Sequence, residues 1–149
     1  FEFAAELVRK GAKLKEICRI ALRKKSKAHC ELEKIIYDRL EFLEDGKIAF
    51  AYLNLEDYEN THAEMGDDEG LVEMLRDIED VEVAVLLKEK EGANGYKASL
   101  RSHETVNVSD ICMLLGGGGH RGAAGCFING TLDQAKTKII NAVKQGLKK

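Results

Sequence analysis

The chain contains 149 residues, of which 44% are hydrophobic and 33% are charged, and its net charge is −3. This composition is typical of a folded domain and excludes a disordered chain. The longest apolar run, residues 48–53, is far shorter than the roughly 20 residues that a membrane-spanning helix needs, so we expect no contact with a membrane. The absence of proline excludes proline-rich linkers.

The four cysteines form no recognisable pattern. Cys18, Cys30, Cys112 and Cys126 are irregularly spaced and include no CxxC pair. Disulfide frameworks are a feature of small secreted domains, and the first residues show no signal peptide. We therefore predict free thiols and a cytoplasmic protein. A zinc site that combines Cys112, Cys126 and His120 is an alternative, which the spacing disfavours.

The charge is unevenly distributed along the chain. Residues 1–94 contain 23 acidic and 15 basic side chains, whereas residues 95–149 contain 3 acidic and 8 basic ones. The C-terminal third is therefore the part that favours an anionic ligand. The alternative is that these lysines are the solvated face of the last helix.

Hydrophobic periodicity predicts helices in the first part of the chain and a strand after them. The expected helices cover residues 2–10, 13–23 and 28–43, and the first strand covers residues 48–53. Residues 54–60 are typical of a turn or a short helix. The chain starts at Phe1, within the first helical pattern, so we expect it to be a piece of a larger protein.

The second part of the chain alternates between strands and helices. We expect a helix beginning near Leu71, strands over 81–87, 96–101 and about 126–128, a helix capped by Asn107, and a last helix that opens at Thr131. Thr131 and Gln134 have the spacing of a capping box. Together these elements predict an α/β (α+β) fold, in which a mixed sheet of about four to five strands packs against helices and a helical linker precedes it.

A run of glycines is the most distinctive motif: Gly116, Gly117, Gly118 and Gly119, followed by His120 and Arg121. Glycine is costly to order, so a chain keeps it where φ must be positive or where a ligand lies against bare backbone. We expect exposed amides here, with a short helix starting near His120. These amides and the two basic side chains predict an anion site. The Gly-Lys-Ser/Thr of a Walker loop is missing, and a flexible loop is the alternative.

The strand before this run carries a second candidate. Lys97, Ser99 and Arg101 alternate with apolar residues and therefore share one face of the strand. Ser99 and Arg101 are placed to meet one phosphate or base, because arginine offers a rigid fork of donors. An ordinary exposed strand arginine is the alternative. No cluster of Asp and His residues suited to a metal occurs in the sequence, so we predict no metal site.

A known family combines these motifs. The segments concerned are Ser99 to Ser102, Val106 to Ile111, and Gly116 to Gly125 with its Gly-Gly-Gly-His sequence. They resemble the C-terminal DHH-associated domain of DHH-family phosphoesterases, most of all the bacterial oligoribonuclease/pAp-phosphatase branch, which is related to RecJ exonuclease. By this resemblance residues 1–33 are a helical remnant or linker of a preceding DHH catalytic domain, and residues 34–149 are the substrate-binding domain.

The resemblance implies where the chemistry takes place. In this family the DHH domain carries the aspartates and histidines that bind two manganese ions and activate water, and its Asp-His-His motif is absent here. The C-terminal domain holds the substrate. Ser99, Arg101 and Ser102 would hold the nucleotide, and the glycine segment with His120 and Arg121 would hold a phosphate. His120 is also a candidate assistant at the scissile phosphate.

We therefore expect this chain to bind a short single-stranded oligonucleotide or a nucleotide phosphate, and to have the missing DHH domain as its partner. Alone it should be inactive and carry no cofactor. Gly122, where the family commonly has a bulkier residue, departs from the pattern. The sequence leaves a homodimer open. The alternatives are a stand-alone RNA-binding module similar to the C-terminal domain of alanyl-tRNA synthetase, and a purely structural or oligomerising domain.

Overall fold

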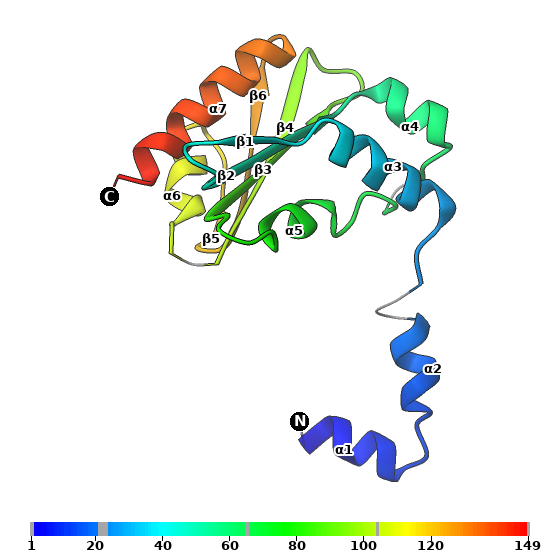
Figure 1. The fold of residues 1–149 in the computed structure, drawn as a ribbon. Coiled ribbons are helices and arrows are strands. Elements are labelled where there is room, and N and C mark those ends of the chain that lie inside the picture. The colour runs from blue at the N-terminus through cyan, green and yellow to red at the C-terminus, as the bar shows by residue number, and fades with distance from the viewer. Residues whose placement is uncertain (1, 21–23, 65, 104, 149) are drawn as a thin grey trace.

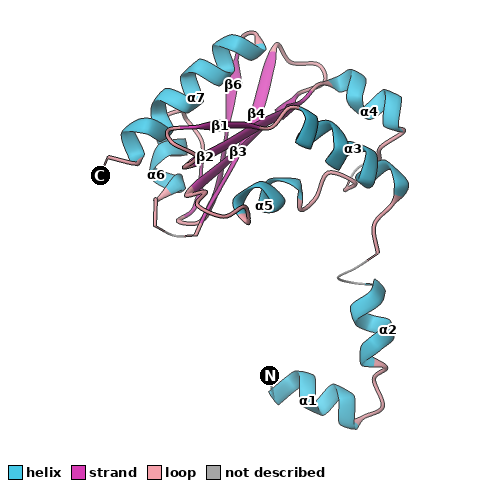
Figure 2. Cartoon of the chain, in the orientation of Figure 1, coloured by secondary structure: helices cyan, strands magenta, loops and turns pink. Residues whose placement is uncertain are grey.

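The computed structural model describes residues 2–20, 24–64, 66–103 and 105–148. A six-stranded sheet with the order β1-β2-β3-β4-β6-β5 lies at its centre (Figures 1 and 2). The strands are β1 (Glu41–Leu43), β2 (Ile48–Leu53), β3 (Val83–Glu89), β4 (Gly95–Ser102), β5 (Gly118–His120) and β6 (Ala123–Asn129). Strands β2 and β3 pair in parallel, and the other neighbours are antiparallel. The predicted mixed sheet is confirmed, with six strands instead of four to five.

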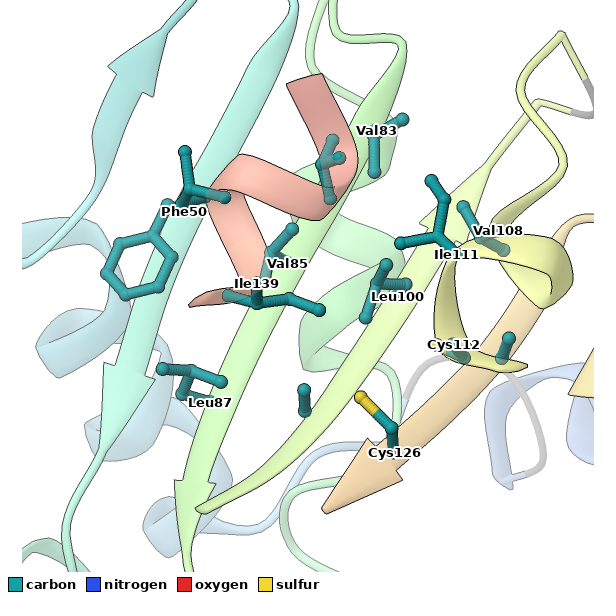
Figure 3. Packing of buried hydrophobic residues seen from close by; sticks show 14 of the residues in the cluster. Phe50, Val83, Val85, Leu87, Leu100, Val108, Ile111, Cys112, Cys126 and Ile139 are labelled. Carbon is teal, nitrogen blue, oxygen red and sulfur yellow. The ribbon is translucent and has the colours of Figure 1, made fainter. Parts of the chain in front are cut away.

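Helices cover the two faces of this sheet unequally. They are α1 (Glu2–Arg9), α2 (Leu14–Cys18), α3 (Lys27–Asp38), α4 (Leu55–Thr61), α5 (Leu71–Arg76), α6 (Val108–Met113) and α7 (Leu132–Gly146). Helices α6 and α7 pack on one face, where Phe50, Val85, Leu100 and Ile139 belong to one buried cluster that reaches from β2 to β6 (Figure 3). The predicted capping box at the start of α7 is present, which sets where this helix begins.

The opposite face is covered only in part. Its buried cluster contains residues of α3, α5, β2 and β3, such as Leu32, Leu75 and Leu86, but none of the described residues of β4, β5 or β6. On those three strands the side chains of this face remain at least partly exposed. We call this uncovered area the open face.

Helices α1 and α2 stand apart from the sheet and contain no buried residue (Figure 1). Large apolar side chains such as Phe3, Leu14 and Ile17 are about half exposed or more. The second expected helix is α-helical only over Leu14–Cys18, and its residues 21–23 lie outside the described part of the chain. No helix in the described ranges is long and apolar enough to cross a membrane.

One sequence prediction is wrong in this region. The helix expected over 28–43 ends at Asp38, because residues 41–43 leave it to pair with β2 as strand β1. The boundary expected between residues 33 and 34 falls inside α3, where Leu32 and Ile36 on either side of it are buried in one cluster. By packing, all of α3 belongs with the sheet.

A partly buried ion pair joins α3, β2 and α4. The guanidinium of Arg39 donates to both carboxylate oxygens of Asp57, at 2.6 and 2.8 Å, and to the carbonyl of Tyr52 at 3.2 Å. Asp57 also accepts from the Asn54 amide at 2.6 Å, which closes the capping box of α4. Since Asp57 is only 6% exposed, removing it leaves several donors without their acceptor.

We predict that Asp57→Ala lowers the free energy of unfolding by about 2 kcal/mol, because it breaks a bidentate ion pair and a helix cap together. Urea denaturation measures this change. The control is Asp77→Ala, which removes an exposed ion pair with Arg76 and should change the free energy by less than about 0.5 kcal/mol. Equal effects of the two substitutions would contradict this account of the fold.

Candidate functional site

Strand register sets which residues share the open face. Cross-strand partners point to the same side of a sheet. His120, Ala123 and Arg101 form one row across β5, β6 and β4, and Gly118, Gly125 and Ser99 form the next. His120 and Arg101 are two strand spacings apart, roughly 10 Å between Cα atoms. The two basic side chains therefore flank a floor of small residues.

A hollow of about 420 Å³ runs along the open face beside β4. Ser99 and Arg101, which the sequence places on one strand face, line it, and so does Lys97 two residues before Ser99. Acidic residues from the loop before α5 and from its first turn line the opposite wall, namely Asp68, Glu69 and Glu73. The hollow is thus mixed in charge, which the net charge of the C-terminal third does not indicate.

Arg101 is held by one of these acids. Its Nε donates to Oε1 of Glu73 at 2.7 Å, and its Nη1 donates to the carbonyl of Leu100 at 3.0 Å. The Arg101 side chain keeps a quarter of its surface exposed. Glu73 thus orients the guanidinium across the hollow and neutralises it, while the donors that these two bonds do not use remain for a ligand.

A second basic side chain that lines the hollow, Lys88, also forms an ion pair with an acid. Lys88 donates to Oδ2 of Asp68 at 2.6 Å, and the hydroxyl of Tyr58 donates to the same oxygen at 3.0 Å. Burial alone would raise the pKa of Asp68, but the hydrogen bond and charge of Lys88, with the bond from Tyr58, hold it below its usual value. Burial and the Asp68 carboxylate raise the pKa of Tyr58 well above its usual range. Tyr58 therefore stays a neutral donor.

Backbone conformation or packing favours glycine at three positions of the run, and Gly118 is the exception. Gly116 has a φ of +78°, which favours glycine. A Cβ on Gly117 would lie 2.2 Å from the Gly125 carbonyl, and one on Gly119 would lie 2.5 Å from the Ala123 carbonyl. At Gly118 a Cβ would meet nothing within 4 Å. The packing of this chain therefore does not require glycine at position 118.

The helix expected to begin near His120 is absent, and that prediction is wrong. Residues 118–120 form strand β5, which turns at Arg121 and Gly122 into β6. The Ser102 amide donates to the Gly122 carbonyl, the Val108 amide donates to the Arg121 carbonyl, and the Ser109 hydroxyl donates to the Gly119 carbonyl, each at 3.0 Å. These three bonds fix the hairpin against the end of β4 and the start of α6.

The predicted site residues therefore separate into two groups. Ser99, Arg101, Gly118 and His120 share the open face. Ser102 points to the other face, where it is 4% exposed and donates to the Val106 carbonyl at 2.7 Å.

Arg121 lines a different hollow, of about 290 Å³, between α6 and α7. Arg121 lies in the turn between β5 and β6, and it does not line the hollow beside β4. Sequence reasoning placed Lys97 on the right face but did not name it as a site residue. It missed Glu73, which no local pattern connects to Arg101.

Metal ligands are not grouped in the described part of the chain. No cluster of three or more His, Cys, Asp or Glu side chains there could hold a metal ion. Cys112 of α6 and Cys126 of β6 are buried in the core on the other side of the sheet, whereas His120 is on the open face, so the alternative zinc site does not form. The contact with Cys126 and burial raise the pKa of the Cys112 thiol, which disfavours the thiolate that a metal needs.

Comparison with known proteins identifies relatives of this sequence and fold. Residues 45–149 match the DHHA1 domain. Over 146 residues the chain is 35% identical to the bifunctional oligoribonuclease and PAP phosphatase NrnA of Thermus thermophilus. That match covers 97% of this chain and 42% of the relative, so the chain spans about two fifths of the length of the curated relative.

Solved structures agree with this match. An exopolyphosphatase-related protein from Bacteroides fragilis superimposes with a TM-score of 0.87 at 25% identity, over 95% of this chain and 42% of that one. A pGpG-specific phosphodiesterase, PggH from Vibrio cholerae, gives a TM-score of 0.52 at 13% identity, over 80% of this chain and 40% of that one. At that identity the second likeness concerns the fold alone.

The glycine geometry predicts opposite outcomes for two neighbours. Gly119→Ala should lower the free energy of unfolding by about 3 kcal/mol or more, because its Cβ meets backbone and its φ of +151° is strained for other residues. Gly118→Ala should change it by less than about 1 kcal/mol. Thermal and urea unfolding of both variants measure this. Similar losses at the two positions would contradict the assignment of Gly118 as free of packing constraints.

Proposed function

This chain belongs to the DHHA1 family, the C-terminal DHH-associated domains of DHH-family phosphoesterases, and we propose that it is the substrate-binding part of an enzyme that hydrolyses short oligonucleotides or nucleotide phosphates. One observation carries the proposal. Arg101, Ser99 and a glycine that packing does not require, Gly118, all lie on one uncovered face of the sheet.

The name of the curated relative supports this substrate class. An oligoribonuclease and a PAP phosphatase both cleave phosphate esters of nucleotides. This chain spans about two fifths of the length of that relative. We propose that the whole protein also includes a DHH domain with a manganese site, because DHHA1 domains accompany a DHH domain.

The side chains of the open face suit binding rather than bond breaking. The guanidinium of Arg101 offers a planar fork to a phosphate or a base edge, and the Ser99 hydroxyl can donate or accept beside it. The backbone at Gly118 lets a ligand approach the sheet without meeting a side chain. His120, at the far end of the row, can donate to a phosphate.

Calorimetric titration of the 149-residue chain with a 5′-phosphorylated adenine dinucleotide tests the proposal. Arg101→Ala should weaken binding by about tenfold or more, because a hydrogen bond to a charged group contributes ~1.5–3 kcal/mol. Gly118→Ala should also weaken it while changing the free energy of unfolding by less than about 1 kcal/mol. Arg76→Ala is the matched control. Arg76, at the end of α5, also forms an ion pair with an acid, Asp77, at 2.7 Å, but it does not line the hollow.

Three results would contradict the proposal. The first is unchanged affinity in Arg101→Ala, and the second is an equal loss in Arg76→Ala. The third is hydrolysis of the dinucleotide by this chain alone with Mn²⁺, because it would place the catalytic centre within these residues. Tighter binding of a structured tRNA than of the dinucleotide would instead favour the RNA-binding alternative.

The Arg101–Glu73 ion pair leads to a separate prediction. Glu73→Gln keeps the shape of the side chain but removes the charge that neutralises Arg101, so affinity for the dinucleotide should rise by about two- to fivefold, the range of a surface ion pair. Glu69→Gln removes the same charge from the same hollow without contacting Arg101 and is the control. Equal gains in both variants would show that Glu73 acts through general charge and not through Arg101.

A further inference from the structure

A phenylalanine lies exposed on the open face, outside the rows already described. Phe127 of β6 pairs with Lys97 of β4 and therefore shares the face of Ser99 and Arg101. It is 39% exposed and belongs to neither buried cluster. Its neighbours in sequence, Cys126 and Ile128, are buried in the core on the other side. The alternation along β6 thus places an aromatic ring in solvent beside the hollow.

The ring of Phe127 rests on strand β4. A Cβ built on Gly95 would lie 2.8 Å from Cζ of Phe127, so the end of the ring lies against the backbone of Gly95. A larger residue at Gly95 would displace the ring. An aromatic side chain supported on one side by a sheet and exposed on the other is a platform on which a base can stack.

Lys97, beside this ring, is the uncommitted cation of the hollow. Lys88 is bonded to Asp68 and Arg101 to Glu73, whereas Lys97 forms no ion pair with any residue in the described ranges. Lys97 lies four residues from Arg101 on the same strand face, which is about 14 Å along the strand. Two phosphates of one strand can therefore contact the two cations separately.

The charges around Lys97 define where the chain of such a ligand would run. Beyond Lys97 a neighbouring hollow of about 480 Å³ opens, where the acids Glu64, Asp68, Glu89 and Glu91 outnumber the lysines Lys88, Lys90 and Lys97 and make it the less favourable place for a phosphate. Toward β6 the open face presents Phe127 and the small residues Gly125 and Ala123. The favourable path therefore leads from Arg101 along β4 to Lys97 and Phe127.

We propose that Phe127 and Lys97 form a subsite for a second nucleotide of a single-stranded oligonucleotide, in which the base stacks on the Phe127 ring and Lys97 contacts the backbone phosphate. The subsite rests on the proposed function of the open face. With this subsite, the domain distinguishes ligands by their length. A mononucleotide occupies only the Arg101 end.

Two adenine ligands with equal numbers of phosphates test the subsite. Adenosine 3′,5′-bisphosphate and the 5′-phosphorylated dinucleotide pApA are titrated calorimetrically into the 149-residue chain. Phe127→Ala should weaken pApA about fivefold or more, the lower range for loss of a stacked base, and leave the bisphosphate unchanged. Phe127→Tyr should restore pApA binding. Lys97→Gln should reduce the slope of log affinity against log salt for pApA by roughly 0.7.

Phe42→Ala is the matched control, because Phe42 is an exposed phenylalanine on β1, at the opposite edge of the sheet. A dinucleotide with 2-aminopurine as its second base adds a direct readout: its fluorescence should be quenched by the wild-type chain and much less by Phe127→Leu, which is apolar but not aromatic.

The outcomes separate the two proposals. If the wild-type chain binds neither ligand, the proposed function fails and the subsite fails with it. If the wild-type chain binds both ligands but Phe127→Ala binds pApA as tightly as wild type, or loses both ligands equally, the subsite is wrong and the proposed function stands.

Discussion

The candidate site depends on the close approach of two backbones. Gly117 and Gly119 bring the segment after α6 so near to β6 that a single Cβ at either position would collide with a carbonyl. This approach lets β5 join the sheet as its last strand, and the hydrogen bonds of the turn at Arg121 and Gly122 fasten it to β4 and α6. His120 and Gly118 are thereby placed on the face that also carries Arg101.

The second determinant is the incomplete cover of the sheet. Helices α3 and α5 bury one face over β2 and β3 and leave it uncovered over β4, β6 and β5. A sheet face floored by glycine and alanine presents few side chains and allows a flat, polar ligand to lie against the backbone. The acids near α5 give this surface a balance of charges, so that a ligand must displace Glu73 from Arg101 or bind beside it.

Local patterns were sufficient for most of the fold and for part of the site. Alternation along residues 96–101 correctly put Ser99 and Arg101 on one face, and Thr131 with Gln134 marked the start of α7. The helix expected near His120 failed because glycine and alanine have no periodicity that distinguishes a hairpin from a helix start. The turn at Gly122 belongs to that hairpin. Glu73 and Phe127 could not be assigned from sequence. Glu73 contacts Arg101 and Phe127 contacts Gly95, and both partners are far away along the chain.

The central claim is that the open face, and not the helical face or the hollow of Arg121, holds the substrate. The most direct measurement is a map of backbone amide chemical shifts as unlabelled pApA is added to the isotope-labelled 149-residue chain. The account predicts that the largest changes fall on residues 97–101, 118–120 and 125–127, with little change in α7. Changes concentrated on α6, α7 and Arg121, with β4 silent, would contradict it.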